Sequence, residues 1–224
     1  MKVAALIPCR TGSKGIPGKN FKVFGNWPLW YWTYKAAIGS DVFDKIIISS
    51  DGGFNFTSVE GAEIDNERPP ELSDDATPSD DVLSYYMKKF PEYDLWCLLQ
   101  PTSPLRTAGD IKKAYRMIKG KKYDSLVSVT WNPCMFWIEK AVGMKEKDYA
   151  IATYHVAKRP NRQDRKEWFM ENGAIYFTKR YVFENCGARL GGCVGLYKMP
   201  KERSYEIDDP LDWELCEFLV KRGK

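Results

Sequence analysis

The residues best suited to chemistry lie in one short loop close to the start of the chain. Directly after an apolar run, residues 8–20 read PCRTGSKGIPGKN. Glycines allow backbone N–H groups to approach phosphate oxygens, while Arg10, Lys14 and Lys19 supply positive charge for a pentavalent transition state and a leaving pyrophosphate. The spacing is neither that of a Walker P-loop nor that of a dinucleotide-binding loop. We therefore predict a polyphosphate site here, in preference to a solvated basic loop.

A second group of chemical interest is acidic and lies at residues 206–212, which read EIDDPLD. In an extended segment Glu206 and Asp208 share a face, because they are two residues apart. There they could hold Mg²⁺ (or Mn²⁺) as hard oxygen ligands next to a triphosphate. A helix cap is the competing interpretation, since Asp209 is followed by Pro210. We assign the two roles separately, with Glu206 and Asp208 as metal ligands and Asp209 as the cap.

Histidine and cysteine chemistry is largely excluded by the composition. His155 is the single histidine, which removes most Ser-His-Asp, Cys-His and multi-histidine metal schemes. The six cysteines include no C-x-x-C pair and no spacing typical of a disulfide framework, so we expect free thiols in a reducing cytoplasm. Any reaction must therefore depend on carboxylates, lysines, arginines and the backbone.

Length and charge indicate a soluble, cytoplasmic, single-domain protein. A chain of 224 residues with 44% hydrophobic and 29% charged residues is expected to form one domain, residues 1–224. The net charge is +4 and basic residues are scattered among acidic ones, so neither nucleic acid nor a membrane surface is an expected partner. The apolar start is too short for a signal peptide, and no stretch approaches the roughly 20 apolar residues of a membrane-spanning helix.

The elements that must position these motifs alternate along the chain. Short buried strands are predicted at 3–7, 45–49, 95–99, 125–129, 173–178 and 194–199. Helices are predicted at 28–40, 78–89, 110–119 and 210–220. This alternation favours an α/β fold with an open, mostly parallel, Rossmann-like sheet. Ligands of such sheets lie outside the carboxyl ends of the strands, which is where the first loop falls.

The alternation lapses between residue 130 and about residue 166. This segment is aromatic and charged, and we interpret it as an excursion from the main sheet that serves as a dimerisation arm. His155 lies in the excursion without a cysteine or histidine partner nearby in the sequence. A structural or interface-facing role is therefore expected for it.

Taken in chain order, the motifs resemble those of the acylneuraminate cytidylyltransferases, or CMP-sialic acid synthetases. The pattern R-x-x-S-K-G-x-x-x-K-N is met in full from Arg10 to Asn20. Four further stretches are similar to that family: ISSDG at 48–52, RPPEL at 68–72, LLQPTSPLR at 98–106 and NGAIY at 172–176. The resemblance covers roughly residues 1–220 and implies a nucleotidyltransferase-type sheet.

The resemblance implies a nucleotide site built on the first loop. The triphosphate would be held by Arg10, Lys14 and Lys19, which together with Asp208 form the implied catalytic set. Ser13 would help to wrap the phosphates and Asn20 would contact the nucleoside. Two further residues match positions that the family uses near the cytosine, namely Arg68 and Ser79.

A sugar site is implied as well, with Gln100, Thr102, Ser103, Arg162, Asn172 and Tyr176 as its substrate-binding residues. Gln100, Thr102 and Ser103 offer the donors and acceptors that a polyhydroxylated keto-acid sugar needs. Arg162 would face the sugar carboxylate, which a guanidinium can bind bidentately. Without the resemblance, residues 102–104 read as an ordinary turn, and Arg162 reads as part of a solvated basic turn.

Two features depart from the family pattern. Many members have aspartate where this chain has Glu206, and the longer side chain could alter the metal geometry or make coordination water-mediated. The connection from Asp51 to Arg68 is also short, and it carries GGFNF at residues 52–56 where a longer helix is usual.

The activity implied by the resemblance is transfer of CMP from CTP to the anomeric hydroxyl of a sialic-acid-like 2-keto sugar acid, with release of pyrophosphate. The acceptor could instead be a legionaminic, pseudaminic or deoxy-octulosonic acid. A different class of function, a catalytically idle nucleotide-binding homologue, also fits the motifs. By resemblance, the protein would be a homodimer that pairs through residues 130–166, and Trp131, Phe136 and Trp137 would give that segment apolar surface to bury.

Overall fold

One large sheet organises the chain. The computed structural model describes residues 1–55, 57–74, 76–120, 122–139, 150–165 and 167–222. Within them, eight strands form a sheet in the order β12-β8-β11-β7-β1-β4-β6-β5. The strands are β1 (Val3–Pro8), β4 (Lys45–Ser49), β5 (Ser58–Val59), β6 (Ala62–Asp65), β7 (Leu95–Leu98), β8 (Ser125–Trp131), β11 (Phe169–Lys179) and β12 (Val194–Met199).

The sheet is mostly parallel, as the sequence predicts. Neighbours β7, β1, β4 and β6 run parallel, and so do β8 and β12. Strand β11 is antiparallel to both of its neighbours, and β5 is antiparallel to β6. The central strand β1 reads VAALIP, and all of its residues except Pro8 are buried. A parallel strand that is covered on both faces must be apolar throughout.

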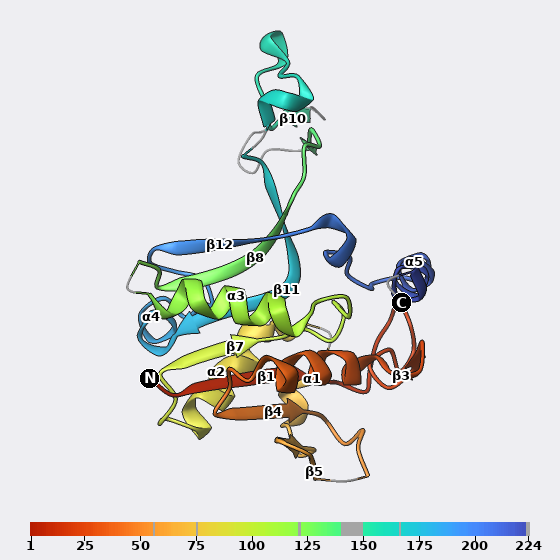
Figure 1. Cartoon of the computed structure of the whole chain (residues 1–224), viewed down its shortest axis with the longest axis vertical. Helices are drawn as coiled ribbons and strands as arrows, with labels where there is room; N and C mark the ends of the chain where they lie inside the picture. Colours follow the sequence, from red (N-terminus) through yellow and green to blue (C-terminus); the bar gives the residue numbers. More distant parts are fainter. Residues whose placement is uncertain (56, 75, 121, 140–149, 166, 223–224) are drawn as a thin grey trace.

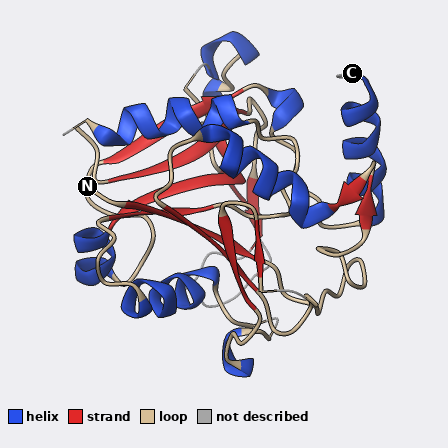
Figure 2. Cartoon of the chain, turned by 60° about the horizontal axis from the view of Figure 1, so that its bottom comes forward, coloured by secondary structure: helices blue, strands red, loops and turns tan. Residues whose placement is uncertain are grey.

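Helices cover both faces of this sheet (Figure 2). Helices α1 (Leu29–Ser40) and α3 (Ala108–Lys119) pack on one face in a core that includes Trp30 and Ile111. Helices α2 (Ser79–Lys89) and α4 (Arg180–Cys186) pack on the other face, where Tyr86 and Phe183 are buried.

The last helix, α5 (Pro210–Arg222), lies apart from the two helical layers, beside the small β2 (Val23–Phe24) and β3 (Trp27–Pro28) ribbon (Figure 1). Its Trp213 and Cys216 pack with Ile16, Phe24 and Ile207 in a separate apolar cluster. This cluster joins the first loop to the acidic segment, so it brings the two chemical motifs of the sequence together. No described helix has the combination of length and apolar character that crossing a membrane requires.

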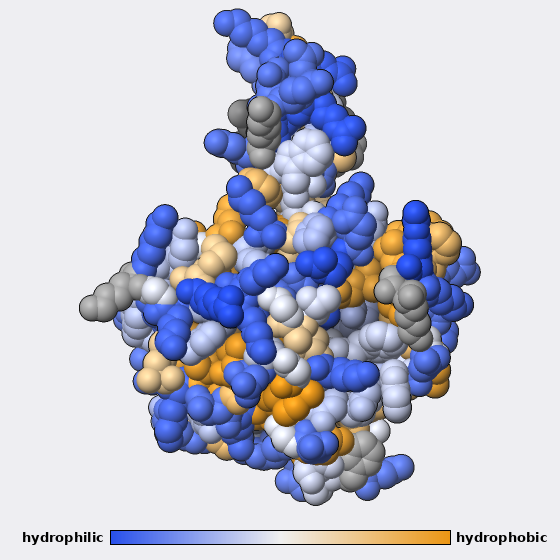
Figure 3. All heavy atoms as spheres, in the orientation of Figure 1, coloured by the Kyte–Doolittle hydropathy of each residue, from blue (hydrophilic) through white to orange (hydrophobic). Residues whose placement is uncertain are grey.

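A narrow arm projects from the sheet. Strands β9 (Trp137–Glu139) and β10 (Ala150–Ala152) pair outside the main sheet and are followed by short 3-10 helices η2 (Val156–Lys158) and η3 (Arg162–Arg165). Figure 1 shows the arm standing clear of the body at the ends of β8 and β11. The predicted excursion at 130–166 falls here, although its residues 140–149 and 166 lie outside the described residues. Figure 3 shows a mainly hydrophilic surface over the arm.

Candidate functional site

The loops that follow parallel strands meet at one edge of the sheet, and they line a pocket. The first loop follows β1, Asp51 lies just beyond β4, and the QPTSPLR segment follows β7. The pocket has a volume of about 260 Å³. The predicted site residues that line it are Arg10, Ser13, Lys19, Asn20, Arg68, Ser79, Gln100, Thr102, Glu206 and Asp208.

The first loop is closed on itself and anchored to its neighbour. Asn20 Nδ2 donates to the carbonyl oxygen of Arg10 at 2.9 Å, which ties the end of the loop to its start. Thr11 donates from its backbone N and its hydroxyl to the two carboxylate oxygens of Asp51, at 2.7 and 3.0 Å. Arg10 donates from Nη1 to the carbonyl oxygen of Asp74 at 2.9 Å. The loop therefore holds a fixed shape around the pocket.

Lys19 connects the first loop to the acidic segment. The residue is 9% exposed, and its Nζ donates to the carbonyl oxygen of Ile207 at 2.6 Å. The same Nζ lies 3.4 Å from Asp208 Oδ1. The backbones also approach closely, since a Cβ at Gly15 would lie 2.3 Å from the carbonyl oxygen of Asp208. A glycine is therefore required at position 15.

Glu206 lies in a space that a glycine leaves open. Thr102 Oγ1 donates to Glu206 Oε1 at 2.8 Å. A Cβ at Gly173 would come within 2.7 Å of both carboxylate oxygens of Glu206, and Gly173 has a φ of +64°. It lies where the register between β11 and β8 shifts, so the Asn-Gly step of the NGAIY motif forms a bulge that admits the carboxylate. Burial raises the pKa of Glu206; the Thr102 bond and Lys19 oppose the rise, and the charge of Asp208 adds to it.

The helix cap predicted at Asp209 is confirmed. Asp209 Oδ1 accepts from the backbone N of Asp212 at 2.9 Å, and Asp212 Oδ2 accepts from the backbone N of Asp209 at 3.2 Å. This reciprocal pair starts α5 with Pro210 as its first residue. Because Asp209 and Asp212 are used in the cap, Glu206 and Asp208 are the carboxylates of the acidic segment that line the pocket, and Asp74 lines it from another segment.

Two buried polar side chains of the pocket have atoms without a hydrogen-bond partner. Arg68 is 4% exposed, and its Nε donates to Ser73 Oγ at 3.0 Å while Nη2 is unpaired. Asn20 is 6% exposed, and its Oδ1 is unpaired. Burial lowers the pKa of Arg68, and the charge of Asp51 opposes that shift. A buried donor and a buried acceptor without partners are costly unless a ligand or water completes them.

Three residues predicted to bind sugar have side chains that are bonded within the protein instead. Ser103 donates to the carbonyl oxygen of Asn172 at 3.2 Å. The Asn172 amide accepts from Ser128 at 2.6 Å and donates to Ser204 at 2.9 Å. Tyr176 donates to Glu171 Oε2 at 3.1 Å and is 4% exposed. These side chains do not line the pocket, and the structure gives them a supporting place behind it.

The other two predicted residues outside the pocket lining are exposed cations. Lys14 is exposed within the first loop. Arg162 belongs to η3 of the arm, where its guanidinium lies 5.2 Å from the ring centre of Trp131. Arg162 therefore does not line the pocket of its own chain.

A buried arginine of the site was not predicted. Arg106 is 3% exposed, and its Nη2 donates to Thr33 Oγ1 at 2.9 Å and to the carbonyl oxygens of Gln100 and Ser103. Burial lowers its pKa to about 10. By binding two carbonyls of one turn, Arg106 fixes the shape of the segment that presents Gln100 and Thr102. It ends the LLQPTSPLR motif, so its position was visible in the sequence although its role was not.

The polar pocket lies at the carboxyl ends of the parallel strands, which is where open α/β folds bind their ligands. The family model described as cytidylyltransferase matches residues 4–221, and the chain belongs to that family.

Curated relatives have consistent names. An N-acylneuraminate cytidylyltransferase A of Danio rerio is 34% identical over 222 residues, which are 98% of this chain and 51% of the relative. N-acylneuraminate cytidylyltransferases of Streptococcus agalactiae and Escherichia coli are 32% and 31% identical, over 93% and 96% of this chain. The chain spans about half the length of these relatives.

Solved structures share the fold at low sequence identity. A CMP:2-keto-3-deoxy-manno-octonic acid synthetase complexed with CTP has a TM-score of 0.69 and 16% identity, with 100% of both chains covered. A 2-C-methyl-D-erythritol 4-phosphate cytidylyltransferase from Thermus thermophilus has a TM-score of 0.62 and 16% identity, with 99% of this chain and 100% of the other covered. Similarity at this level establishes a common fold.

Proposed function

We propose that this protein transfers CMP from CTP to the anomeric hydroxyl of a sialic-acid-like 2-keto sugar acid and releases pyrophosphate. The observation that carries the proposal is one pocket that combines a phosphate-type cationic loop, two carboxylates, and the unpaired buried atoms of Arg68 and Asn20. The names of the relatives support the acceptor class.

The first loop would hold the triphosphate. Arg10 and Lys19 both line the pocket, and backbone N–H groups of a glycine-rich loop can approach phosphate oxygens closely. The charges of Arg10 and Lys19 would stabilise negative charge on the phosphate oxygens as the anomeric hydroxyl attacks the α-phosphorus in line, and then on the departing pyrophosphate. Positioning and charge stabilisation suffice for this reaction, so no covalent enzyme intermediate is required.

The base would be read by the unpaired atoms. Cytosine offers ring acceptors and an exocyclic amino donor, whereas uracil has an acceptor and a ring N–H at the corresponding places. Arg68 Nη2 supplies N–H donors and Asn20 Oδ1 supplies an acceptor, so together they suit a nucleoside with both kinds of group. Ser79, at the start of α2, also lines the pocket.

Glu206 and Asp208 suit a divalent cation that arrives with the nucleotide. Mg²⁺ is commonly bound by one or two carboxylates together with substrate phosphates, and these two hard oxygen donors line the same pocket as the cationic loop. Among the described residues, no cluster of three or more His, Cys, Asp or Glu side chains is arranged for a metal, which favours shared coordination with the triphosphate. When bound, Mg²⁺ or Mn²⁺ would neutralise phosphate charge.

The sugar would lie next to Gln100 and Thr102, which line the pocket. Ser103, Asn172 and Tyr176 would support this region from behind. Legionaminic, pseudaminic and deoxy-octulosonic acids present the same carboxylate and anomeric hydroxyl, and they remain the alternatives for the acceptor.

Pairing of two chains through the arm is part of the proposal. The arm exposes Phe136, Trp137 and Ile138, each at least half accessible. Exposed aromatic surface of this kind marks an interaction site.

Pyrophosphate release tests the proposal directly. CTP, ATP, GTP and UTP are each supplied with Mg²⁺ and with N-acetylneuraminic, legionaminic, pseudaminic or deoxy-octulosonic acid. Turnover with CTP and one nonulosonic acid is the expected result, and it names the acceptor. CTP binding without turnover across the panel would favour the catalytically idle homologue, and absence of CTP binding would reject both functions.

A further inference from the structure

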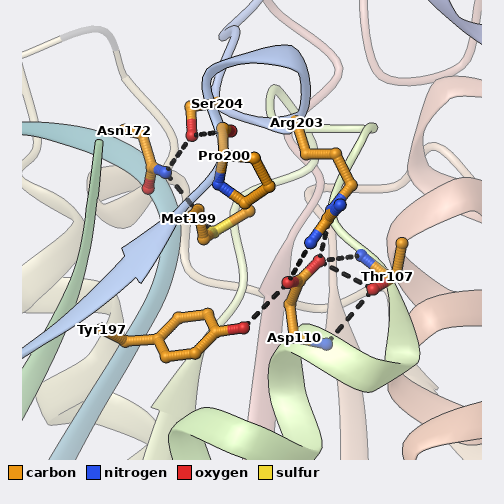
Figure 4. Close-up of polar contacts among 8 residues, drawn as sticks. All are labelled: Thr107, Asp110, Asn172, Tyr197, Met199, Pro200, Arg203 and Ser204. Atoms are coloured by element: carbon orange, nitrogen blue, oxygen red, sulfur yellow. Dashed lines mark hydrogen bonds and ion pairs between the residues drawn. The ribbon is translucent and has the colours of Figure 1, made fainter. Parts of the chain in front are cut away.

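The acidic segment that carries Glu206 and Asp208 is anchored immediately upstream, in the turn η4 (Lys201–Arg203) that follows β12. Figure 4 shows the side chains of Arg203, the last residue of η4, and of Ser204, which follows it, pointing in different directions. Arg203 reaches Asp110 on α3, and Ser204 lies against Asn172 of β11. Glu206 follows only two residues later, so little chain separates it from these anchors.

The contact between Arg203 and Asp110 is bidentate, with the carboxylate buried and the arginine side chain 36% exposed. Arg203 Nε donates to Asp110 Oδ2 at 2.9 Å, and Nη2 donates to Oδ1 at 2.8 Å. Asp110 is 1% exposed, and it also accepts from Tyr197 Oη at 2.8 Å. A bidentate pair fixes the angle between its partners as well as their separation. The direction in which the chain leaves η4 is therefore defined.

Asp110 also fixes the substrate segment on the other side of the pocket. Its carboxylate accepts from the backbone N and the hydroxyl of Thr107, at 2.9 and 2.7 Å, and so caps α3. Thr107 directly follows the QPTSPLR segment. That segment in turn contacts the acidic one, because Thr102 donates to Glu206 and accepts from the backbone N of Ile207 at 2.8 Å. One buried carboxylate thus connects both segments that border the pocket.

Stability alone does not account for this arrangement. Taking the Asp110 carboxylate out of water costs desolvation that the attraction of the partly exposed Arg203 roughly offsets, so this ion pair by itself adds little to stability. What the pair supplies is a defined orientation of the chain that continues to Glu206.

We propose that Asp110 and Arg203 are positioning residues that set Glu206 and Asp208 for metal binding at the triphosphate. The inference rests on the proposed function, because it takes these two carboxylates as the metal ligands. Outer partners that orient metal ligands typically change metal affinity or activity by about 10- to 100-fold when they are removed.

The test compares Arg203→Ala and Arg203→Lys with Tyr197→Phe as the matched control. Tyr197→Phe removes a bond to the same carboxylate from a residue that lies before η4, so it perturbs Asp110 without releasing the acidic segment. Manganese binding in the presence of CTP is measured by electron paramagnetic resonance, alongside CTP affinity in EDTA. The Mg²⁺ concentration for half-maximal turnover and the kcat are measured in the same preparations.

Arg203→Ala is expected to weaken manganese binding and raise the half-maximal Mg²⁺ concentration about tenfold or more, with CTP affinity in EDTA within twofold. Arg203→Lys should fall between, since lysine restores the charge but not the two-point contact. Tyr197→Phe should lower the melting temperature and leave metal binding within twofold.

Wild-type metal binding in a folded Arg203→Ala protein would overturn the positioning role, and so would an equal metal defect in Tyr197→Phe. If Arg203→Ala does not fold, the comparison of Arg203→Lys with Tyr197→Phe decides on the same criteria. Absence of turnover in the wild type with every acceptor would instead count against the proposed function. Turnover of the wild type is therefore measured before any variant is compared.

Discussion

Lys19 is the side chain with the most direct bearing on phosphate chemistry. Its Nζ is buried and lies between the first loop and the acidic segment, 3.4 Å from Asp208. In a desolvated site, one cation aimed at developing charge is worth about 10²–10³-fold in rate. We expect Lys19→Ala to lower kcat by at least about 100-fold in a steady-state assay of pyrophosphate release.

Lys14 provides the comparison for that experiment. It is exposed and does not line the pocket, so solvent screens its charge and Lys14→Ala should cost less rate than Lys19→Ala. Circular dichroism should show both variants folded. Near-normal turnover in both would reject the role assigned to the first loop.

Glu206 should cause kcat/KM to fall at acid pH. Burial raises its pKa above the usual value of 4.5, so the carboxyl is neutral at low pH and would serve as the proposed metal ligand only as pH rises through the raised pKa. Metal favours the ionised form. The acid limb of kcat/KM should therefore move to lower pH as Mg²⁺ is increased, in a profile measured at several Mg²⁺ concentrations. Glu206→Gln should abolish that dependence. If the fall of kcat/KM at acid pH does not change with Mg²⁺ concentration, it is caused by another group.

The sequence predicted the composition of the pocket better than the arrangement of its supports. Residues that follow parallel strands must meet at one edge, so Arg10, Gln100 and Thr102 were placed correctly beside the pocket. Asn172 was predicted to bind sugar, but its amide is bonded to Ser128 and Ser204, which are distant in the sequence. A motif shows which residues are present, whereas the partners of a buried amide depend on the completed fold.

Helix α3 depends on a carboxylate that holds three segments together. Burial would raise the pKa of Asp110, but the bonds from Arg203, Thr107 and Tyr197 outweigh burial and lower it to about 2. Because the folded-state pKa is below the ordinary value of 3.8, this group stabilises the fold above about pH 4 and loses that effect as pH falls toward 2. The melting temperature of Asp110→Asn should accordingly be lower than wild type near neutral pH, and the difference should shrink below pH 4.

The N-terminal cap of α5 can be tested separately. Asp209→Ala removes an acceptor for the backbone N of Asp212 and should reduce the free energy of unfolding by about 1 kcal/mol in a urea titration. Glu214→Ala, at an exposed position of the same helix, is the control and should change it by less than about 0.5 kcal/mol. Equal losses in both variants would contradict the cap.

Long apolar or amphipathic elements were predictable, and short or irregular ones were not. Strands β1, β4 and β12 agree with the predicted ranges to within one residue, because continuous or alternating apolar residues identify them. Helix α4 has only seven residues and was missed. Strand β11 begins at Phe169, four residues before the predicted start, because Gly173 forms a bulge inside the strand and was interpreted as its boundary.

The arm is the surface through which we propose that two molecules pair. Phe136, Trp137 and Ile138 give the described part of the arm apolar surface, since they are 50%, 54% and 54% exposed. A homodimer buries such a patch against its symmetry-related copy. The sequence predicted an excursion here because the β/α alternation lapsed. It did not predict the pairing of β9 with β10, since three-residue strands are too short to show a periodicity.

Sedimentation velocity at micromolar concentration should therefore find a dimer for the wild type and a monomer for Trp137→Ala combined with Ile138→Ala. The combined variant removes two large apolar side chains of β9 that are each more than half exposed, one from each face of the strand. Phe218→Ala is the matched control, because Phe218 is 57% exposed on α5, away from the arm. It should remain dimeric. A monomeric wild type would contradict pairing through the arm. A combined variant that remains dimeric would place the contact on another surface, and the exposed residues of α5 would then be replaced next.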